Sequence, residues 1–349
     1  MPGRIKYIDA LRGLAMLMVV MVHVEGFSVF IEEFHMSFFR RICEALMLPL
    51  FFFISGFLAR PISGKALMIK CTQLLVPSII LGLLYSCYIH KDPVSFIRNI
   101  YKYGYWFTLT LVEMLVTINL ITKLNRKNQH SGFIILFIAA LLYLTKVPFN
   151  NIRALEYIGD IFCMHQFFIY FHFFAVGYVL SNNKTFLSKL LSMQPIITLA
   201  LSIFCFSIFV RFTYTDEQLA TNVLLKMYRF MQDPVLGYTG IIVLFKMFYD
   251  KQSSHSDGLV YRVLQCIGRH TLEIYLLHYF FLPRLPELGI ILVQSPNLVI
   301  EAISVMLLSL VVITVSMALS KILSTNSIIG FLLLGAKPHI FNKTEKKHA

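Results

Sequence analysis

The sequence predicts an all-α protein, a polytopic bundle of about ten helices that cross a membrane. Of its 349 residues, 57% are hydrophobic and only 14% are charged, whereas soluble domains contain roughly 45–50% apolar and about 25% charged residues. The mean hydropathy of the chain is +0.72. The apolar residues also gather in runs long enough to cross roughly 30 Å of hydrocarbon as helices. Composition and run length therefore both indicate an integral-membrane protein.

The apolar runs follow one another along the whole chain. Polar clusters such as LNRKNQHSG, SNNKT and DKQSSHSDG separate them, as is typical of loops. The fifth run contains GFIILFIAALLYLTKV and the eighth PVLGYTGIIVLFKMFY; both are shorter or interrupted. Because no repeat or soluble domain is evident, we expect residues 1–349 to form a single integral-membrane domain with a short basic tail at about 321–349. The predicted spans are 8–30, 42–59, 71–89, 103–122, 132–147, 166–181, 194–212, 234–249, 271–293 and 299–320.

The basic residues predict how the bundle lies in the membrane. With an even number of helices, both termini and the loops after the second, fourth, sixth and eighth helices share one side. That side carries 20 of the 31 Lys and Arg residues, and the other carries 11. Because Lys and Arg are in excess in cytoplasmic loops, we expect both termini to be cytoplasmic.

Charge and cysteine content argue against two classes of function. The net charge of +13 comes from Lys and Arg in short loops, where such residues anchor a bundle to membrane surfaces, so no nucleic-acid partner is expected. The six cysteines form no C-x-x-C pair, so the sequence suggests neither a disulfide framework nor a thiolate metal site. The histidines have no HExxH-like spacing either, so we predict no metal site.

Ionisable residues inside the first apolar run are the first sign of function. In DALRGLAMLMVVMVH, Arg12 and His23 are eleven residues apart, which places them on one helix face about 16 Å apart along the axis. Asp9 precedes Arg12 by three residues and can pair with it. Arg12 can instead reach lipid phosphates and His23 can be a packing residue. Buried ionisable groups are nevertheless functional candidates by default, because they are costly in a membrane.

Further polar residues lie within the other runs. Ser55 stands near the end of LPLFFFISGFLARP, and Tyr275 and His278 are three apart on one helix face in GRHTLEIYLLH. Trp106 lies seven residues before the buried acid Glu113. Trp106 can stack on an adenine or a sugar, or it can belong to an interfacial aromatic belt. Ser55 can equally serve close helix packing beside Gly56.

These residues resemble acyltransferase family 3, the bacterial integral-membrane O-acyltransferases that modify cell-surface and lipid-linked glycans. The most specific feature is the Arg followed by ten residues and His in the first helix. The matching segments run in the family's order over nearly the whole chain. They are IDALRGLAMLMVVMVH (8–23), LPLFFFISGFL (48–58), KCTQLLVP (70–77), YWFTLTL (105–111), FHFFAVGYVL (171–180) and GRHTLEIYLLH (268–278).

The resemblance implies a reaction and its partners. An acyl-CoA, with acetyl-CoA the first candidate, would donate an acyl group from the cytoplasm to a hydroxyl of a glycan acceptor in the cell envelope, and no other cofactor would be bound permanently. His23 would be catalytic, Arg12 would act on the donor or in positioning, and the basic stretch containing Lys70 would meet the CoA phosphates. Where the family commonly has two arginines three apart, this chain has Lys70 and Gln73.

The expected mechanism uses His23 as general base toward the acceptor hydroxyl, because imidazole takes and releases protons near neutrality. Tyr275, His278 or Ser55 could then donate a hydrogen bond to the oxyanion. The sequence leaves open the acyl group, the acceptor sugar, a covalent acyl-histidine step and a homo-oligomer. A transporter or flippase that uses Arg12, His23 and Glu113 is the alternative, and a non-catalytic assembly subunit is a third interpretation.

Overall fold

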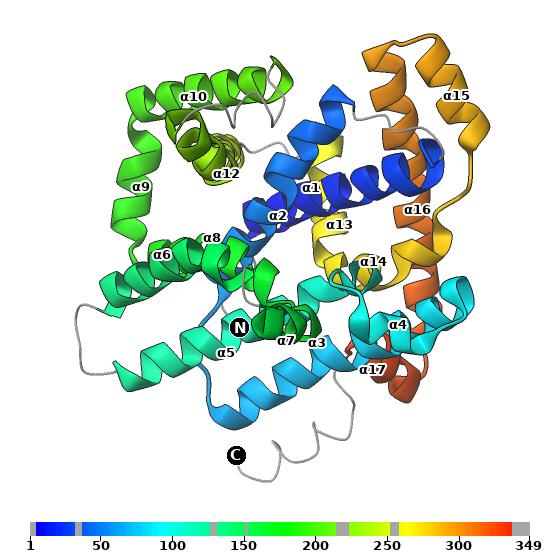
Figure 1. Cartoon of the computed structure of the whole chain (residues 1–349), viewed down its shortest axis with the longest axis horizontal. Coiled ribbons are helices and arrows are strands. Elements are labelled where there is room, and N and C mark those ends of the chain that lie inside the picture. Colours follow the sequence, from blue (N-terminus) through cyan, green and yellow to red (C-terminus); the bar gives the residue numbers. More distant parts are fainter. Residues whose placement is uncertain are drawn as a thin grey trace. The chain divides into compact units, whose positions relative to one another are not determined.

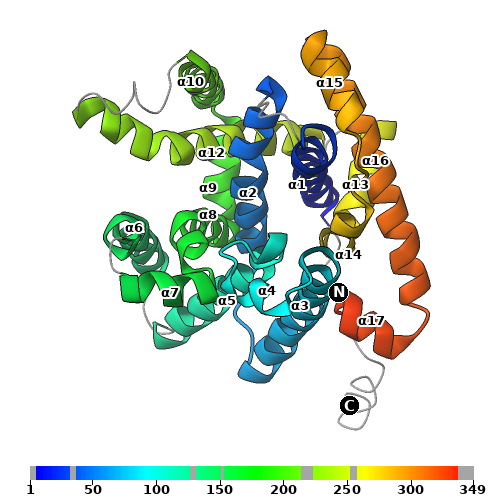
Figure 2. The same cartoon turned by 45° about the vertical axis from the view of Figure 1, so that its right-hand side comes forward.

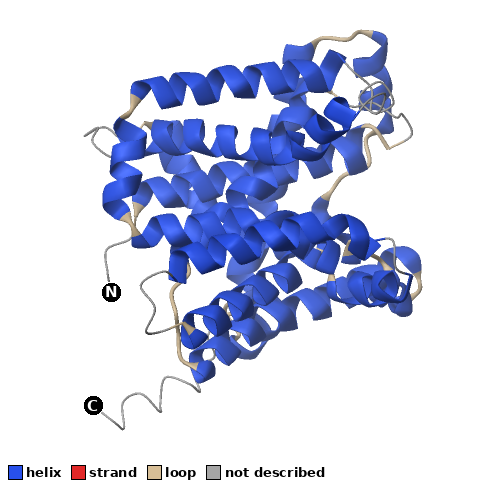
Figure 3. Cartoon of the chain, turned by 60° about the vertical axis from the view of Figure 1, so that its left-hand side comes forward, coloured by secondary structure: helices blue, strands red, loops and turns tan. Residues whose placement is uncertain are grey.

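The fold is described from a computed structural model, which covers residues 5–31, 37–125, 131–150, 153–213, 223–251 and 258–336. Within these ranges every regular element is a helix (Figure 3). The chain divides into two compact units. Unit 1 comprises Met1–Ile54, Leu180–Thr271 and Leu282–Thr314, and unit 2 comprises Ser55–Val179, Leu272–Phe281 and Val315–Ala349.

The helices include all ten apolar runs of the sequence and several shorter segments between them. Four short elements are π-helices at Glu25–Val29 and Ser86–His90 and 3-10 helices at Lys102–Gly104 and His278–Phe281. The α-helices are α1 Lys6–Val24, α2 Phe38–Leu58, α3 Gly64–Tyr85, α4 Pro93–Arg98, α5 Trp106–Leu124, α6 Ser131–Asn150, α7 Arg153–Phe162, α8 Met164–Asn182, α9 Lys184–Ser192, α10 Gln194–Thr213, α12 Val223–Lys251, α13 Leu259–Arg269, α14 Thr271–Leu277, α15 Pro286–Gln294, α16 Leu298–Leu323 and α17 Ser327–Leu334.

Six of the described helical segments are long and apolar enough to cross a membrane. They are Lys6–Val29, Phe38–Leu58, Gly64–Ile89, Trp106–Leu124, Gln194–Thr213 and Leu298–Leu323. The predicted span 271–293 is not one continuous helix, because residues 282–285 separate Phe281 from α15. It becomes a seventh span if both pieces are counted together. The all-helical membrane fold is confirmed, whereas the count of ten and the cytoplasmic termini stay predictions.

In unit 1, α1 and α13 cross with their backbones in contact (Figures 1 and 2). Gly13 of α1 lies on the carbonyl of Leu264, and Gly268 of α13 lies on the carbonyl of Asp9; a Cβ atom at either glycine would overlap that carbonyl. Small residues are what allow membrane helices to approach this closely. Helix α13 lies between two of the runs from which spans were predicted, so sequence analysis did not anticipate this crossing.

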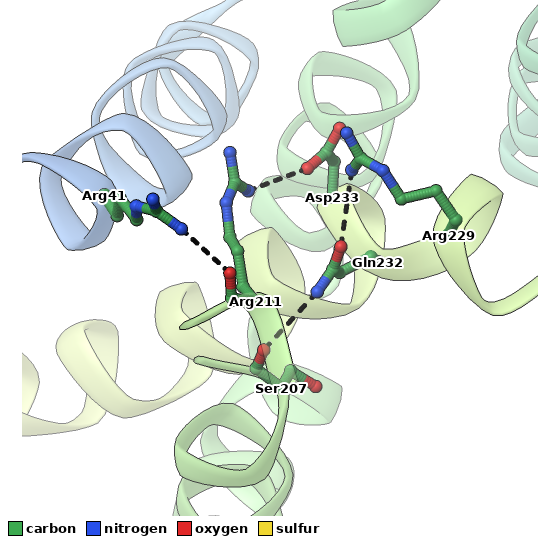
Figure 4. Close-up of polar contacts among 6 residues, drawn as sticks. All are labelled: Arg41, Ser207, Arg211, Arg229, Gln232 and Asp233. Atoms are coloured by element: carbon green, nitrogen blue, oxygen red, sulfur yellow. Dashed lines mark hydrogen bonds and ion pairs between the residues drawn. The ribbon is translucent and has the colours of Figure 1, made fainter. Parts of the chain in front are cut away.

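A second group of unit 1 contacts joins α2, α10 and α12 through arginines (Figure 4). Arg41 Nη1 donates to the Arg211 carbonyl at 2.9 Å, and its guanidinium lies 4.9 Å from the centre of the Phe212 ring. Arg211 in turn pairs with Asp233 at 3.0 Å. Beneath these groups Ala45, Ile208 and Leu236 form an apolar cluster. These arginines therefore hold α2, α10 and α12 together.

In unit 2, α17 packs against α3 (Figure 2). The Gln73 side chain on α3 donates a hydrogen bond to the carbonyl of Gly335 at 3.0 Å. Gly335 follows α17 with a φ of 66°, a left-handed conformation that favours glycine. Part of the expected basic tail is thus a helix docked on α3; residues 337–349 lie outside the described ranges.

The loop before α5 holds an unusual backbone conformation. Lys102, Tyr103 and Gly104 have φ values of 46°, 50° and 95° in succession. The buried Lys102 ammonium donates to the carbonyls of Ile97 (2.7 Å), Asn99 (2.8 Å) and Asp160 (2.6 Å). Burial lowers the pKa of Lys102 below its ordinary value. Lys102 thus ties the residues that follow α4 to α7, and fixes the point at which α5 begins.

Candidate active site

Arg12 is held in place by a residue from a distant part of the chain. Its Nη2 donates a hydrogen bond to Thr271 Oγ1 at 2.6 Å, and both residues belong to unit 1. Thr271 is the first residue of α14 and is only 3% exposed. Thr271 therefore orients the Arg12 guanidinium, because charge-assisted hydrogen bonds are short and directional.

The helix crossing explains how Thr271 comes to Arg12. Gly13 is the residue after Arg12, and Gly268 lies three residues before Thr271. Because the two glycines bring α1 and α13 into backbone contact, the end of α13 at Arg269 and the start of α14 are placed beside Arg12. Asp9 lies one turn before Arg12 and is only 6% exposed. Its carbonyl is the one that Gly268 contacts.

His23 lies at the other end of α1, in its last turn. Its ring is partly exposed and lies 5.8 Å from the Phe27 ring. The chain continues as a π-helix from Glu25 to Val29, an arrangement that is frequent at functional sites. The π-helix is anchored by a hydrogen bond from the Leu285 amide to the Ser28 carbonyl at 2.8 Å. Arg12 and His23 therefore share one helix in unit 1, as expected.

Tyr275 and His278 lie together in unit 2, where backbone carbonyls engage the Tyr275 hydroxyl and His278 Nδ1. The Tyr275 hydroxyl donates to the Gly104 carbonyl at 2.9 Å. His278 is fully buried, and its Nδ1 lies 3.0 Å and 2.9 Å from the carbonyls of Ile274 and Tyr275. Because a carbonyl only accepts, Nδ1 carries the hydrogen. These contacts favour a structural role for both residues.

The end of α2 contains Ser55 and Gly56. A Cβ atom on Gly56 would overlap the backbone of Phe174 in α8, so this glycine is required for close packing within unit 2. The Ser55 side chain is partly exposed and hydrogen-bonds to no other described residue. Its hydroxyl is therefore available to a ligand.

The basic residues that follow α2 lie on a helix. Helix α3 begins at Gly64 rather than at the expected residue 71, so Lys65 and Lys70 are exposed on its first turns. Arg60 Nη1 donates to the carbonyls of Phe57 (3.1 Å) and Ala59 (2.7 Å) at the end of α2. Because Gln73 binds Gly335, the position where the family commonly has an arginine makes a structural contact here.

Trp106 and Glu113 lie on one face of α5 in unit 2. The Trp106 ring stacks on Tyr170 of α8 with centres 5.9 Å apart and planes at 23°. Glu113 Oε2 is buried and has no hydrogen-bond partner in the described part of the chain. Two further buried atoms, Thr110 Oγ1 and Gln166 Oε1, also lack partners. Thr110 and Gln166 were not among the residues predicted from the sequence, although Trp106, Thr110 and Glu113 have the i, i+4, i+7 spacing of one helix face.

The predicted residues thus fall into two groups. Asp9, Arg12 and His23 belong to unit 1; Ser55, Lys70, Trp106, Glu113, Tyr275 and His278 belong to unit 2. In the part of the chain that the structure describes, no three His, Cys, Asp or Glu side chains are grouped so as to hold a metal ion.

The comparison with known proteins gives one match. A family model described as an acyltransferase domain matches residues 5–321, which include every candidate residue above. No curated protein and no solved structure shows significant similarity to the chain. The expected family is therefore confirmed over nearly the whole chain: the protein belongs to this family of acyltransferase domains.

Proposed function

We propose that the protein is an O-acyltransferase of the bacterial cytoplasmic membrane. It moves an acyl group, in the first instance acetyl, from cytoplasmic acyl-CoA to a hydroxyl of a cell-surface or lipid-linked glycan. Membership of the acyltransferase family carries this proposal, because the matched region includes both Arg12 and His23. The hydrogen bond that fixes Arg12 on Thr271 supports a specific task for the guanidinium.

The proposed reaction is a direct transfer with His23 as general base. Neutral imidazole takes the proton of the acceptor hydroxyl while that oxygen attacks the thioester carbonyl. The tetrahedral intermediate then expels the CoA sulfur as the carbon–sulfur bond breaks, and the imidazolium returns its proton to the thiolate. The products are an O-acyl ester and free CoA. A positioned base typically contributes about 10²–10⁴ in rate.

The remaining candidate residues are proposed either to bind the acyl-CoA donor or to stabilise the oxyanion. Arg12 lies about 16 Å along α1 from His23, toward the terminus that we predict to be cytoplasmic, and it would bind the acyl-CoA from that side. Lys65 and Lys70 are exposed on α3 and would meet the CoA phosphates. For the oxyanion we favour Ser55, because the Tyr275 hydroxyl and His278 Nδ1 already donate to backbone carbonyls.

The test is acyl transfer by purified protein. Radiolabelled acetyl-CoA is incubated with the protein and a panel of lipid-linked glycans, and label in the glycan is measured. We expect transfer, and we expect His23→Ala to abolish it while thermal stability is kept. Wild-type protein that neither transfers nor hydrolyses any acyl-CoA would contradict the proposal.

The transporter alternative retains one supporting observation: Glu113 on α5 has a buried Oε2 with no hydrogen-bond partner among the described residues. An intramembrane carboxyl can belong to a substrate or proton path. Reconstituted vesicles distinguish the two functions: a transporter moves unmodified glycan without acyl-CoA, whereas the proposed enzyme produces acylated glycan only when acyl-CoA is present.

A further inference from the structure

Three buried polar atoms on α5 and α8 lack partners among the described residues. Thr110 is fully buried and its Oγ1 makes no hydrogen bond to any described residue. The same is true of Gln166 Oε1, in a residue that is 2% exposed, and of the buried Glu113 Oε2. Buried polar groups in native proteins nearly always have a partner, and an exception points to a water, ion or ligand.

An aromatic pair joins the two helices at this place. Trp106 and Thr110 are four residues apart on α5, and Gln166 and Tyr170 are four apart on α8, so each pair shares a helix face. The stacked rings of Trp106 and Tyr170 bring these faces together. All five residues belong to unit 2. The partnerless atoms and the aromatic pair therefore form one polar-aromatic face.

The chemistry of this face selects its ligand. The amide oxygen of Gln166 and a carboxylate oxygen of Glu113 accept hydrogen bonds, and the Thr110 hydroxyl both donates and accepts, so the ligand must present several donors. The α5 positions 106, 110, 113 and 117 and the α8 positions 166, 170, 173 and 177 hold no Lys or Arg, so the phosphates of CoA would find no counter-charge there. Hydroxyl groups above an apolar C–H surface are the features of a neutral sugar ring, which fits acceptor oxygens beside aromatic rings.

We propose that the polar-aromatic face of α5 and α8 binds a neutral saccharide, with Thr110, Glu113 and Gln166 receiving its hydroxyl groups beside Trp106 and Tyr170. That this saccharide belongs to the glycan acceptor rests on the proposed function. The predicted orientation agrees with this assignment, because Trp106 begins α5 at the side that we expect to face outward. Glu113 lies two turns deeper.

The chain contains a single tryptophan, so its fluorescence reports on this face alone. We would titrate the full-length protein in nanodiscs with glucose, galactose, N-acetylglucosamine and maltose, without acyl-CoA, and follow Trp106 emission. Choline and coenzyme A serve as cationic and anionic probes. We expect a saturable change with at least one neutral saccharide and none with the charged probes.

Matched threonines on α5 provide the controls. Thr110 has no partner, whereas Thr108 Oγ1 lies 2.7 Å from Ser78 Oγ and 3.2 Å from the Tyr105 carbonyl. Thr110→Val and Glu113→Gln should each weaken saccharide binding by about tenfold or more, which corresponds to about 1.4 kcal/mol. Thr108→Val should leave binding unchanged. If Thr108→Val does not fold, Thr239→Val in unit 1 takes its place.

The proposal is overturned if no neutral saccharide changes the emission saturably, if all variants bind equally, or if choline or coenzyme A binds instead. Because the assay needs no turnover, its result is independent of the enzyme assay. Saccharide binding without acyl transfer would keep this site and contradict the proposed function. Transfer that is unaffected by Thr110→Val and Glu113→Gln would contradict the assignment of this site to the acceptor and keep the function.

Discussion

Arg12 Nη2 and Thr271 Oγ1 are 2.6 Å apart, although the two residues are separated by 259 positions in the chain. This bond depends on the crossing of α1 and α13 at Gly13 and Gly268. It turns a guanidinium inside an apolar helix toward one fixed partner. The position of Arg12 is therefore determined by residues near the end of the matched region, far from Arg12 in sequence.

Removing the Thr271 hydroxyl should impair the use of acyl-CoA. In Thr271→Val, Arg12 loses a part-buried hydrogen bond to its charged group, of a kind worth about 1.5–3 kcal/mol. We expect the KM for acyl-CoA to rise about tenfold while the KM for the acceptor stays constant. Thr271→Ser should restore most of the loss. Thr239→Val is the control, because Thr239 bonds only within its own helix, at 2.7 Å and 3.3 Å. Equal kinetics in Thr271→Val and wild type would contradict a positioning role.

The two glycines of the α1–α13 crossing should tolerate no side chain. Gly13→Ala and Gly268→Ala would each place a Cβ atom on backbone of the facing helix, and overpacking of this kind costs about 1–3 kcal/mol or more. We expect a lower thermal midpoint in both variants and slower acyl transfer, because Arg12 moves away from Thr271. Gly258→Ala is the control, since no atom lies within 4 Å of its Cβ position. Equal midpoints in all three variants would show that the crossing is not tight.

Lys102 should make stability depend on alkaline pH. Its pKa is lowered in the folded protein, so between the folded and unfolded pKa values the unfolded state binds more protons and stability rises with pH. Below the folded pKa this contribution does not vary. We therefore expect the thermal midpoint of wild type, measured relative to Lys102→Met, to increase as pH rises toward about 10.4. A difference that stays constant or falls over that range would contradict the prediction.

Lys102→Met should also be less stable than wild type at neutral pH. The substitution leaves the carbonyls of Ile97, Asn99 and Asp160 without their shared donor, and each buried acceptor that loses its partner costs about 1–3 kcal/mol. Lys91→Met is a suitable control, because Lys91 is exposed. Thermal melts of both variants in detergent measure the contrast.

Substitutions of Glu113 and of Thr110 should each preserve or raise thermal stability while they reduce acyl transfer. Because neither Glu113 Oε2 nor Thr110 Oγ1 has a partner in the described ranges of the chain, Glu113→Gln and Thr110→Val remove a desolvation cost rather than a bond. We expect thermal midpoints equal to or above wild type together with reduced acyl transfer. Glu44→Gln is the control for the same change of side chain: it breaks the pair with Arg40 at 2.8 Å and should not raise the midpoint. A lower midpoint in both test variants would indicate that the two residues stabilise the fold.

The fold class could be predicted because membrane helices satisfy their backbone hydrogen bonds locally. Each apolar run therefore predicts a helix from its own residues alone. The structure has helix in every run, although residues 282–285 interrupt the run at 271–293. Short amphipathic elements could not be found in this way. Helix α13 contains LVYRVLQCIGR, and its apolar face is buried only because it packs against α1. The predicted span began later than α3 does, because Lys65 and Lys70 interrupt the apolar residues of its first turns.

The candidate residues show the same difference between relations within one helix and contacts between distant segments. The sequence by itself determined the Arg12 and His23 pair on α1, because eleven residues within one helix fix their relation. Only the tertiary structure decided that Thr271 holds Arg12, that the Tyr275 hydroxyl binds the Gly104 carbonyl, and that Thr110 and Gln166 join Glu113. Helix periodicity acts over a few residues and can be read along the chain. Partners from distant segments depend instead on how helices cross, and close contacts such as those at Gly13 and Gly56 exist only after the chain has packed.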